Sequence, residues 1–139
     1  MNFEDVTLES WRKALETAKN SGDMTEVSKC YNQMAIAHQK HGDYDKALDF
    51  SSKALEISER IRDTPGILKS CHQIAIAHQK RGDYDKALDF SYKTLEIAEK
   101  TGDITGVAKS YNQIGIVHQK RGDYEWALDF YQKAFDIAE

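Results

Sequence analysis

Three histidines recur at a spacing of 40 residues, at His38, His78 and His118. Imidazole is a frequent zinc ligand, so a metal site is the first chemistry to consider. Zinc needs nitrogen ligands at about 2.0–2.1 Å, whereas packed helices lie roughly 8–10 Å apart. Histidines that each belong to a different repeated segment are therefore too distant to share one ion. We expect them to pack at the core and to donate to a neighbour, and we expect no metal and no cofactor.

Other residue types that often carry catalysis are present without the spacing that catalysis needs. The chain has no phosphate-binding glycine loop, no HExxH pattern and no nucleophile beside a recognisable base. Asp45 and Asp49 form a recurring acidic pair, but one helical turn apart on an outer face they are ordinary solvated charges. Cys30 and Cys71 are expected to be small buried hydrophobic side chains. The sequence therefore predicts a protein that is not an enzyme.

Composition places the 139-residue chain among globular proteins, because 40% of its residues are hydrophobic and 30% are charged. A net charge of −4 argues against general binding to nucleic acid. No apolar run approaches the roughly 18 residues of a membrane span, and the acidic start MNFEDVTLESW is not typical of a secretion signal. The two cysteines do not make a disulfide framework and suggest a reducing compartment. We therefore expect a cytoplasmic protein that binds neither nucleic acid nor membrane.

A nine-residue block is repeated along the chain: GDYDKALDF begins at Gly42 and again at Gly82, and the variant GDYEWALDF begins at Gly122. A fixed period of 40 residues indicates stacked supersecondary units. Such an array offers a long continuous surface rather than a closed pocket. The sequence thus predicts an interaction surface, although the repeat alone does not identify the partner.

Each period is expected to contain two helices. Between Ile104 and Lys120 the apolar residues recur in steps of three and four, which places them on one helical stripe. Gly122 can then end that helix in the left-handed conformation, and Asp123 can cap the next one. The same reasoning along the chain predicts helices at about residues 5–20, 24–40, 44–61, 64–80, 84–100, 104–120 and 124–139.

These helices predict a single repeat domain over residues 1–139. It would consist of an N-terminal half unit (5–22) followed by three units (23–62, 63–102 and 103–139). A period near 40 residues also suits HEAT and armadillo repeats. A propeller is excluded by the helical spacing and by the scarcity of alternating, strand-like segments.

The spacing of residues inside each unit resembles the tetratricopeptide repeat, in its long-period form whose helices exceed those of the common unit of about 34 residues. The third unit matches the family pattern at Tyr111, Ile114, Gly115, His118, Gly122, Tyr124, Ala127, Tyr131 and Ala134. The first unit matches at Tyr31, Met34, Ala35, His38, Gly42, Tyr44, Ala47 and Ala54, and the second at Cys71, Ile74, Ala75, His78, Gly82, Tyr84, Ala87 and Thr94. The recurring histidines, and also Ser51 and Ser91, stand where the family usually has aromatic residues. The resemblance implies an all-α, right-handed helical-hairpin solenoid of seven antiparallel helices.

The same resemblance implies where a partner would bind, because in this family the first helices of the units line a concave face that usually takes peptides. Amide side chains there can pair with the backbone of an extended peptide, and lysines suit acidic residues or a C-terminal carboxylate. The implied peptide-binding residues are Lys29, Asn32, Gln33, Ile36, Gln39, Lys40, Lys69, His72, Gln73, Ile76, Gln79, Lys80, Lys109, Asn112, Gln113, Ile116, Gln119 and Lys120. The implied function is a non-enzymatic interaction module for an extended, acidic peptide segment. The alternative interpretation of these polar rows is an ordinary solvated helix face.

The last predicted helix is more aromatic than the helices it repeats. Tyr131 and Phe135 replace a serine and a leucine of both earlier units, and Trp126 replaces a lysine. Aromatic side chains dominate interface energies, so an uncovered last helix is a candidate contact site. The residues expected at this edge are Trp126, Phe130, Tyr131 and Phe135.

This edge suggests an alternative function, a structural protein whose main partner is a second copy of itself. Two copies could meet about a two-fold axis, which closes the assembly as a homodimer, or could stack head to tail into a fibre. A partner helix would also cover the edge. A stretch of a longer array, or a consensus design, would leave the same edge exposed.

Overall fold

The computed structural model describes the backbone of residues 3–138 and the side chains of residues 7–138. Over that range it contains seven helices and no strand: α1 (Phe3–Ser21), α2 (Met24–Lys40), α3 (Tyr44–Arg60), α4 (Thr64–Arg81), α5 (Tyr84–Thr101), α6 (Ile104–Arg121) and α7 (Tyr124–Ala138). The predicted all-α solenoid is confirmed, and each observed helix end lies within two residues of its predicted position. The predicted end of the last helix, Glu139, lies outside the described residues.

The connections between helices are short turns that end in aspartate. Four of these aspartates accept a hydrogen bond from the backbone N–H three residues later, at 2.9–3.3 Å; they are Asp23, Asp43, Asp63 and Asp103. The residue before each aspartate has a positive φ, between 71° and 89° at the five glycines and 58° at Arg62. A left-handed residue at this point ends one helix and turns the chain back, so consecutive helices pack antiparallel.

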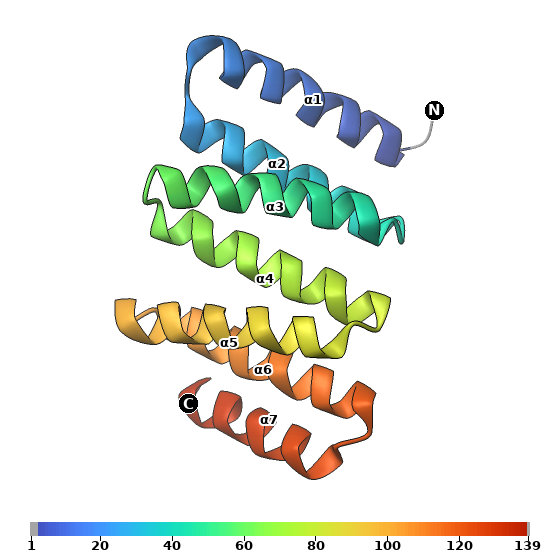
Figure 1. Ribbon diagram of the computed structural model, residues 1–139, viewed down its shortest axis with the longest axis vertical. Coiled ribbons are helices and arrows are strands. Elements are labelled where there is room, and N and C mark those ends of the chain that lie inside the picture. Colours follow the sequence, from blue (N-terminus) through green and yellow to red (C-terminus); the bar gives the residue numbers. More distant parts are fainter. Residues whose placement is uncertain (1–2, 139) are drawn as a thin grey trace.

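The helices form two layers. The backbones of the first helices of the units lie close together, α2 with α4 and α4 with α6, whereas among the described residues the backbones of α3 and α5, and of α5 and α7, do not approach each other in this way. The first helices are therefore the inner, concave layer, and α3, α5 and α7 are the outer layer. Figure 1 shows the helices stacked in chain order along the long axis, with α1 at one end and α7 at the other.

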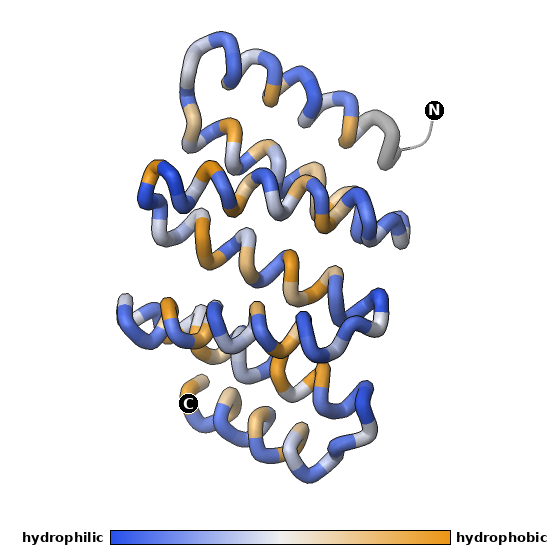
Figure 2. The backbone as a smooth tube through the Cα atoms, in the orientation of Figure 1, coloured by the Kyte–Doolittle hydropathy of each residue, from blue (hydrophilic) through white to orange (hydrophobic). Residues whose placement is uncertain are grey.

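The core is a series of clusters between successive helices rather than one centre. Leu55 of α3 packs with Cys71 of α4, and Leu95 of α5 packs with Ile114 of α6. Apolar and hydrophilic stretches alternate along the helices in Figure 2, as expected for helices that are buried on one face only. Each such buried side chain contributes about 1.5–3 kcal/mol, so each unit depends on its neighbours for stability.

The three recurring histidines pack inside the units. Each stacks on a phenylalanine with ring centroids 5.3–5.9 Å apart, in the pairs His38–Phe50, His78–Phe90 and His118–Phe130. Burial lowers the pKa of His38 and of His78. The Nδ1 atom of His78 lies 3.6 Å from the Asp83 carboxylate, which is too long for a hydrogen bond. The expected packing is confirmed, but the expected donation to a neighbour is made neither at His78 nor at His118, whose Nδ1 atom likewise lies 3.6 Å from a carboxylate, that of Asp123.

The two cysteines lie apart from each other in the core. Cys30 and Cys71 are unpaired and completely buried, and burial raises the pKa of both thiols. Within the described part of the chain, no three His, Cys, Asp or Glu side chains are grouped so that they could hold a metal ion. In the same range, no helix has the length and apolar character that crossing a membrane requires.

Candidate functional site

Two neighbouring cavities lie between the first helices. One, of about 250 Å³, lies between α2 and α4 and is lined by Thr25, Ser28, Lys29, Asn32, Gln33, Asp63, Pro65, Gly66 and Lys69. The other, of about 220 Å³, lies between α4 and α6 and is lined by Pro65, Leu68, Lys69, His72, Thr94, Asp103, Thr105, Gly106 and Lys109. Pro65 and Lys69 line both cavities, so the two adjoin each other at α4, and together they are here named the inner groove.

Helical spacing positions the groove residues. Pro65, Lys69 and His72 follow one another at intervals of four and three residues, so they share one face of α4. The same register places lysines on α2 and α6, because the units repeat every 40 residues. A Cβ atom at Gly106 would lie 2.7 Å from the Asp103 carboxylate. Glycine there lets the capping aspartate and the helix backbone form the cavity wall together.

The lysines of the inner groove carry unpaired charges. Lys29, Lys69 and Lys109 are exposed, and none of them forms an ion pair within the described residues. Outside the groove, by contrast, Arg81 pairs with Asp45 at 3.2 Å. The groove is therefore locally positive, although the chain has a net charge of −4.

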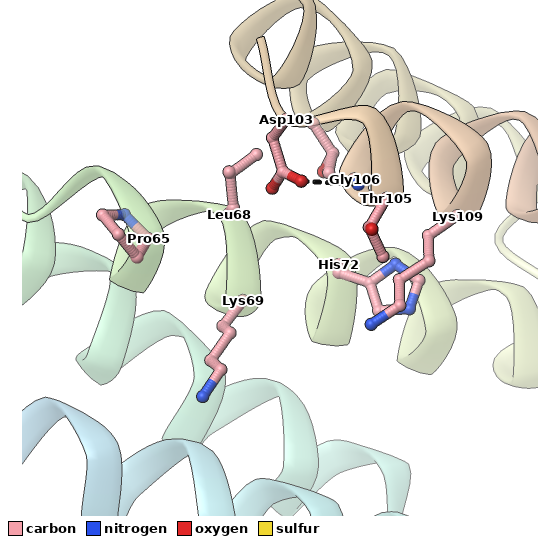
Figure 3. Close-up of a pocket in the computed structure, with 9 residues that line it drawn as sticks. Pro65, Leu68, Lys69, His72, Asp103, Thr105, Gly106 and Lys109 are labelled. Atoms are coloured by element: carbon pink, nitrogen blue, oxygen red, sulfur yellow. Dashed lines mark hydrogen bonds between the residues drawn. The ribbon is translucent and has the colours of Figure 1, made fainter. Parts of the chain in front are cut away.

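The acidic residues in the cavity walls already have partners. The carboxylate of Asp103 accepts the backbone N–H of Gly106 at 2.9 Å, and that of Asp63 accepts the N–H of Gly66 at 3.3 Å. Figure 3 shows the bond between Asp103 and Gly106 at the wall of the second cavity. These two carboxylates keep their charge while they cap helices, so they offset two of the three lysine charges in the groove.

His72 lies in the second cavity, beside Lys109 (Figure 3). It is half-buried, and burial together with the Lys109 charge lowers the pKa of its imidazole. At the equivalent position of α2, Asn32 exchanges hydrogen bonds with Ser70 of α4, at 3.1 and 3.2 Å. His72 makes no such bond among the described residues, and Ser110 donates instead to the backbone carbonyl of Gly106 at 2.8 Å.

The structure brings six of the predicted peptide-binding residues together. The inner groove contains Lys29, Asn32, Gln33, Lys69, His72 and Lys109. The remaining predicted residues lie outside both cavities. Those that are half-buried are Ile36, Gln39, Gln73, Ile76, Gln79 and Ile116, and those that are exposed are Lys40, Lys80, Asn112, Gln119 and Lys120.

Three amide side chains differ from the expectation that they face a peptide. Asn32 and Gln113 are only 4% and 5% exposed, because neighbouring helices cover them. The amide of Asn32 is moreover occupied by Ser70. The amide oxygen of Gln119 accepts the hydroxyl of Tyr131 at 2.7 Å, so this side chain is directed to α7 rather than to the groove.

Several groove residues were not predicted from the sequence, above all those one turn before each lysine. Thr25, Pro65 and Thr105 each precede a groove lysine by four residues. Residues four apart share a helix face, so this spacing was a signal that could have found them. The capping aspartates gave no comparable signal, because their place in a cavity wall depends on how the units stack.

The α7 edge also differs in part from its prediction. Phe130 is only 6% exposed and belongs to the cluster with Leu95, so it is a core residue. The ring of Tyr131 packs against Gly115, where an added Cβ atom would lie 2.7 Å from the ring. Trp126 and Phe135 are exposed as predicted, each by 59%.

Leu128 is a further exposed residue of this edge. It is 67% exposed, although its counterpart Leu88 is partly buried and packs in the cluster between α5 and α6. Phe135 likewise takes the place of Leu95, which is buried there. The exposed apolar face of α7 is therefore the face that α3 and α5 cover with the next first helix.

Comparison with known proteins gives a consistent family. A tetratricopeptide repeat family model matches residues 67–139, which is more than half of the chain, and a second model of the same description matches residues 27–62. No curated protein is similar enough in sequence to count as a match.

Several solved structures share the fold. BtubC (BKLC) from P. vanneervenii is 21% identical with a TM-score of 0.81, over 99% of this chain and 57% of that one. Aspartyl phosphate phosphatase F from Bacillus subtilis is 16% identical with a TM-score of 0.89, over 98% of this chain and 36% of that one. A third structure is that of a putative kinesin light chain from Podosopora anserina with nearly identical TPR-like repeats. Its sequence is 17% identical to this chain with a TM-score of 0.75, over 97% of this chain and 67% of that one. This chain thus spans little more than half of BtubC, and at these identities the likeness concerns the fold alone.

Proposed function

This chain belongs to the tetratricopeptide repeat family, and from that premise we propose its function. The chain is a non-enzymatic protein–protein interaction module whose inner groove binds an extended, acidic peptide segment. The period of 40 residues supports its assignment to the long-period form of the family. The two unpaired, buried thiols suit a reducing compartment, so the proposed location is the cytoplasm.

The observation that carries this proposal is the row of unpaired lysines along the two adjoining cavities of the inner groove. Lys29, Lys69 and Lys109 come from three successive first helices, one per unit, so their charges are spaced along the groove. An extended peptide can follow such a row and place one acidic group near each lysine. Gln33 in the wall offers both a donor and an acceptor to the peptide backbone.

The test is charge reversal in the groove. Lys69→Glu together with Lys109→Glu should weaken binding of an acidic peptide by roughly tenfold, since each exposed charge pair contributes on the order of 0.5–1 kcal/mol. Affinities would be measured by fluorescence anisotropy on peptides selected from a library that holds acidic, basic and apolar members. Added salt should weaken the unaltered complex as well, because exposed charges are screened.

A matched control separates the groove from net charge. Lys13 and Lys86 are exposed on the outer helices α1 and α5, so Lys13→Glu with Lys86→Glu changes the net charge equally without touching the groove. This variant should bind acidic peptides almost as the unaltered chain does. Selection of basic or purely apolar peptides, or equal losses in both variants, would count against the proposal.

The exposed face of α7 favours a second candidate function, self-association. Leu128 and Phe135 are 67% and 59% exposed, and large apolar groups in that state usually mark a contact site. The exposed residues of α1 include Ser10, Lys13 and Thr17, which are polar, so head-to-tail stacking of α1 on α7 would place polar side chains against an apolar face. A two-fold contact between two α7 helices is therefore favoured.

Sedimentation tests this candidate. The unaltered chain should form dimers at concentrations of some tens of micromolar, the range in which modest interfaces associate. Leu128→Ser with Phe135→Ser should leave monomers of unchanged helicity. Ile61→Ser removes an exposed apolar residue at the end of α3 and should leave the dimer intact. A monomeric unaltered chain at high concentration would remove self-association from consideration.

A further inference from the structure

At one of the groove positions where the middle unit departs from both neighbours, the residue is titratable. Asn32 and Asn112 occupy this position in the first and third units, whereas the second unit has His72. His72 is also a titratable side chain that lines the cavity between α4 and α6. Imidazole is the side chain whose charge changes nearest to neutral pH, so this substitution adds a property that asparagine lacks.

We propose that His72 makes peptide binding in the inner groove proton-linked: it takes up a proton when a carboxylate of the peptide enters the cavity between Lys69 and Lys109. The inference rests on the proposed function, since it concerns the same groove and the same acidic ligand. It adds a regulator, pH, and a single residue that responds to it.

The charged groups around His72 come from a few elements. Lys109 and the capping Asp103 belong to α6 and its start, and Lys69 lies one turn away on α4 itself. From α5 only Thr94 lines this cavity, no residue of α3 does, and the nearest groove charge on α2 is Lys29 in the adjoining cavity. Asp103 accepts the N–H of Gly106, and Lys109 is the charged group that acts on the pKa of His72.

The sign of the pH effect follows from this environment. Without a ligand, burial and the nearby Lys109 disfavour the imidazolium form, so His72 is neutral at pH 7. A bound carboxylate has the opposite sign and raises the pKa of the imidazole. Binding then takes up a proton, and affinity rises as the pH falls from above the pKa of the complex toward that of the unliganded protein.

His72 has no evident structural role in the fold. The Asn32 side chain holds α2 to α4 through Ser70, and His72 leaves the corresponding link between α4 and α6 unmade in the described structure. His72→Asn restores the residue type of both neighbouring units, so the introduced amide can bond Ser110 as Asn32 bonds Ser70. This variant should therefore fold at least as well as the unaltered chain.

The experiment measures the affinity of a fluorescein-labelled peptide of six glutamates between pH 8.0 and pH 6.0. In the unaltered protein the affinity should increase roughly threefold to tenfold as the pH falls. This increase requires a rise of about one to one and a half units in the imidazole pKa on binding, because the whole linked gain is reached only below the pKa of the unliganded protein. In His72→Asn the change should be less than about twofold. His41→Asn alters an exposed histidine outside both cavities and should keep the full pH dependence.

The possible outcomes distinguish the role of His72 from the binding of acidic peptides. A pH dependence that persists in His72→Asn, or an affinity of the unaltered protein that does not change with pH, overturns the role of His72 and leaves acidic-peptide binding standing. Absence of binding at every pH overturns the proposed function and this inference with it. In NMR titrations the His72 ring signals should show a higher pKa when the peptide is present, and an unchanged or lower pKa would contradict the proposal.

Discussion

Replacing Gly115 with alanine should destabilise the fold by about 1–3 kcal/mol, the usual cost of overfilling a packed interior. A Cβ atom at Gly115 would lie 2.7 Å from Cε1 and 2.8 Å from Cδ1 of Tyr131. The ring cannot move aside freely, because the Tyr131 hydroxyl donates to the amide oxygen of Gln119 at 2.7 Å. Urea unfolding, followed by circular dichroism, would measure the loss.

The same substitution should change sign when the ring is absent. The two earlier units carry alanine and serine at these positions, in the pairs Ala35 with Ser51 and Ala75 with Ser91. In a Tyr131→Ser background, Gly115→Ala recreates that pair, and alanine favours a helix over glycine by up to about 1 kcal/mol. Gly115→Ala should then stabilise rather than destabilise. An equal cost in both backgrounds would show that contact with the ring is not the reason for glycine at this position.

Gly82→Val should cost about 1–2 kcal/mol, the penalty for holding a residue with a Cβ atom in the left-handed conformation. Gly82 has φ = +86° at the end of α4, and a β-branched side chain resists that conformation most. No atom lies within 4 Å of a Cβ placed there, so the cost comes from the backbone and not from a clash. Thermal and urea unfolding of the variant would test this value.

The chain supplies its own control for this prediction. Arg62 has φ = +58° at the turn between α3 and α4, the one turn without glycine. Arg62→Gly should therefore stabilise the fold by about 1 kcal/mol, because the same backbone penalty is removed. Unfolding midpoints that shift in opposite directions for Gly82→Val and Arg62→Gly support the explanation. Unchanged midpoints in both variants would contradict it.

Helix positions, turns and family could be predicted from the sequence because each depends on residues close together in the chain. Gly122 followed by Asp123 ends one helix and begins the next by local backbone chemistry alone. The apolar residues at intervals of three and four set the buried face of each helix, and the period of 40 residues sets their order in the stack. None of these features requires knowledge of a distant contact.

Only the tertiary structure decided which repeated polar residues face the groove. Lys69 and His72 line it with free polar groups, whereas the amide of Asn32 is bound to Ser70 and that of Gln119 to Tyr131. A repeat in sequence places equivalent residues on equivalent helix faces. It does not specify how closely two faces approach, since that depends on the combined size and hydrogen bonding of side chains from both helices.

The same reason explains the edge of α7. Sequence composition identified its aromatic residues, yet Phe130 and Tyr131 pack inward while Leu128, which is not aromatic, is exposed. The Tyr131 ring fits against α6 because Gly115 has no side chain there. Gly115 lies 16 residues earlier in the sequence and in another helix. The sequence by itself determined that this protein is a stack of helices with one apolar face each. The packing of neighbouring units decided which side chains remain available to a partner, because burial is a property of pairs of surfaces and not of single helices.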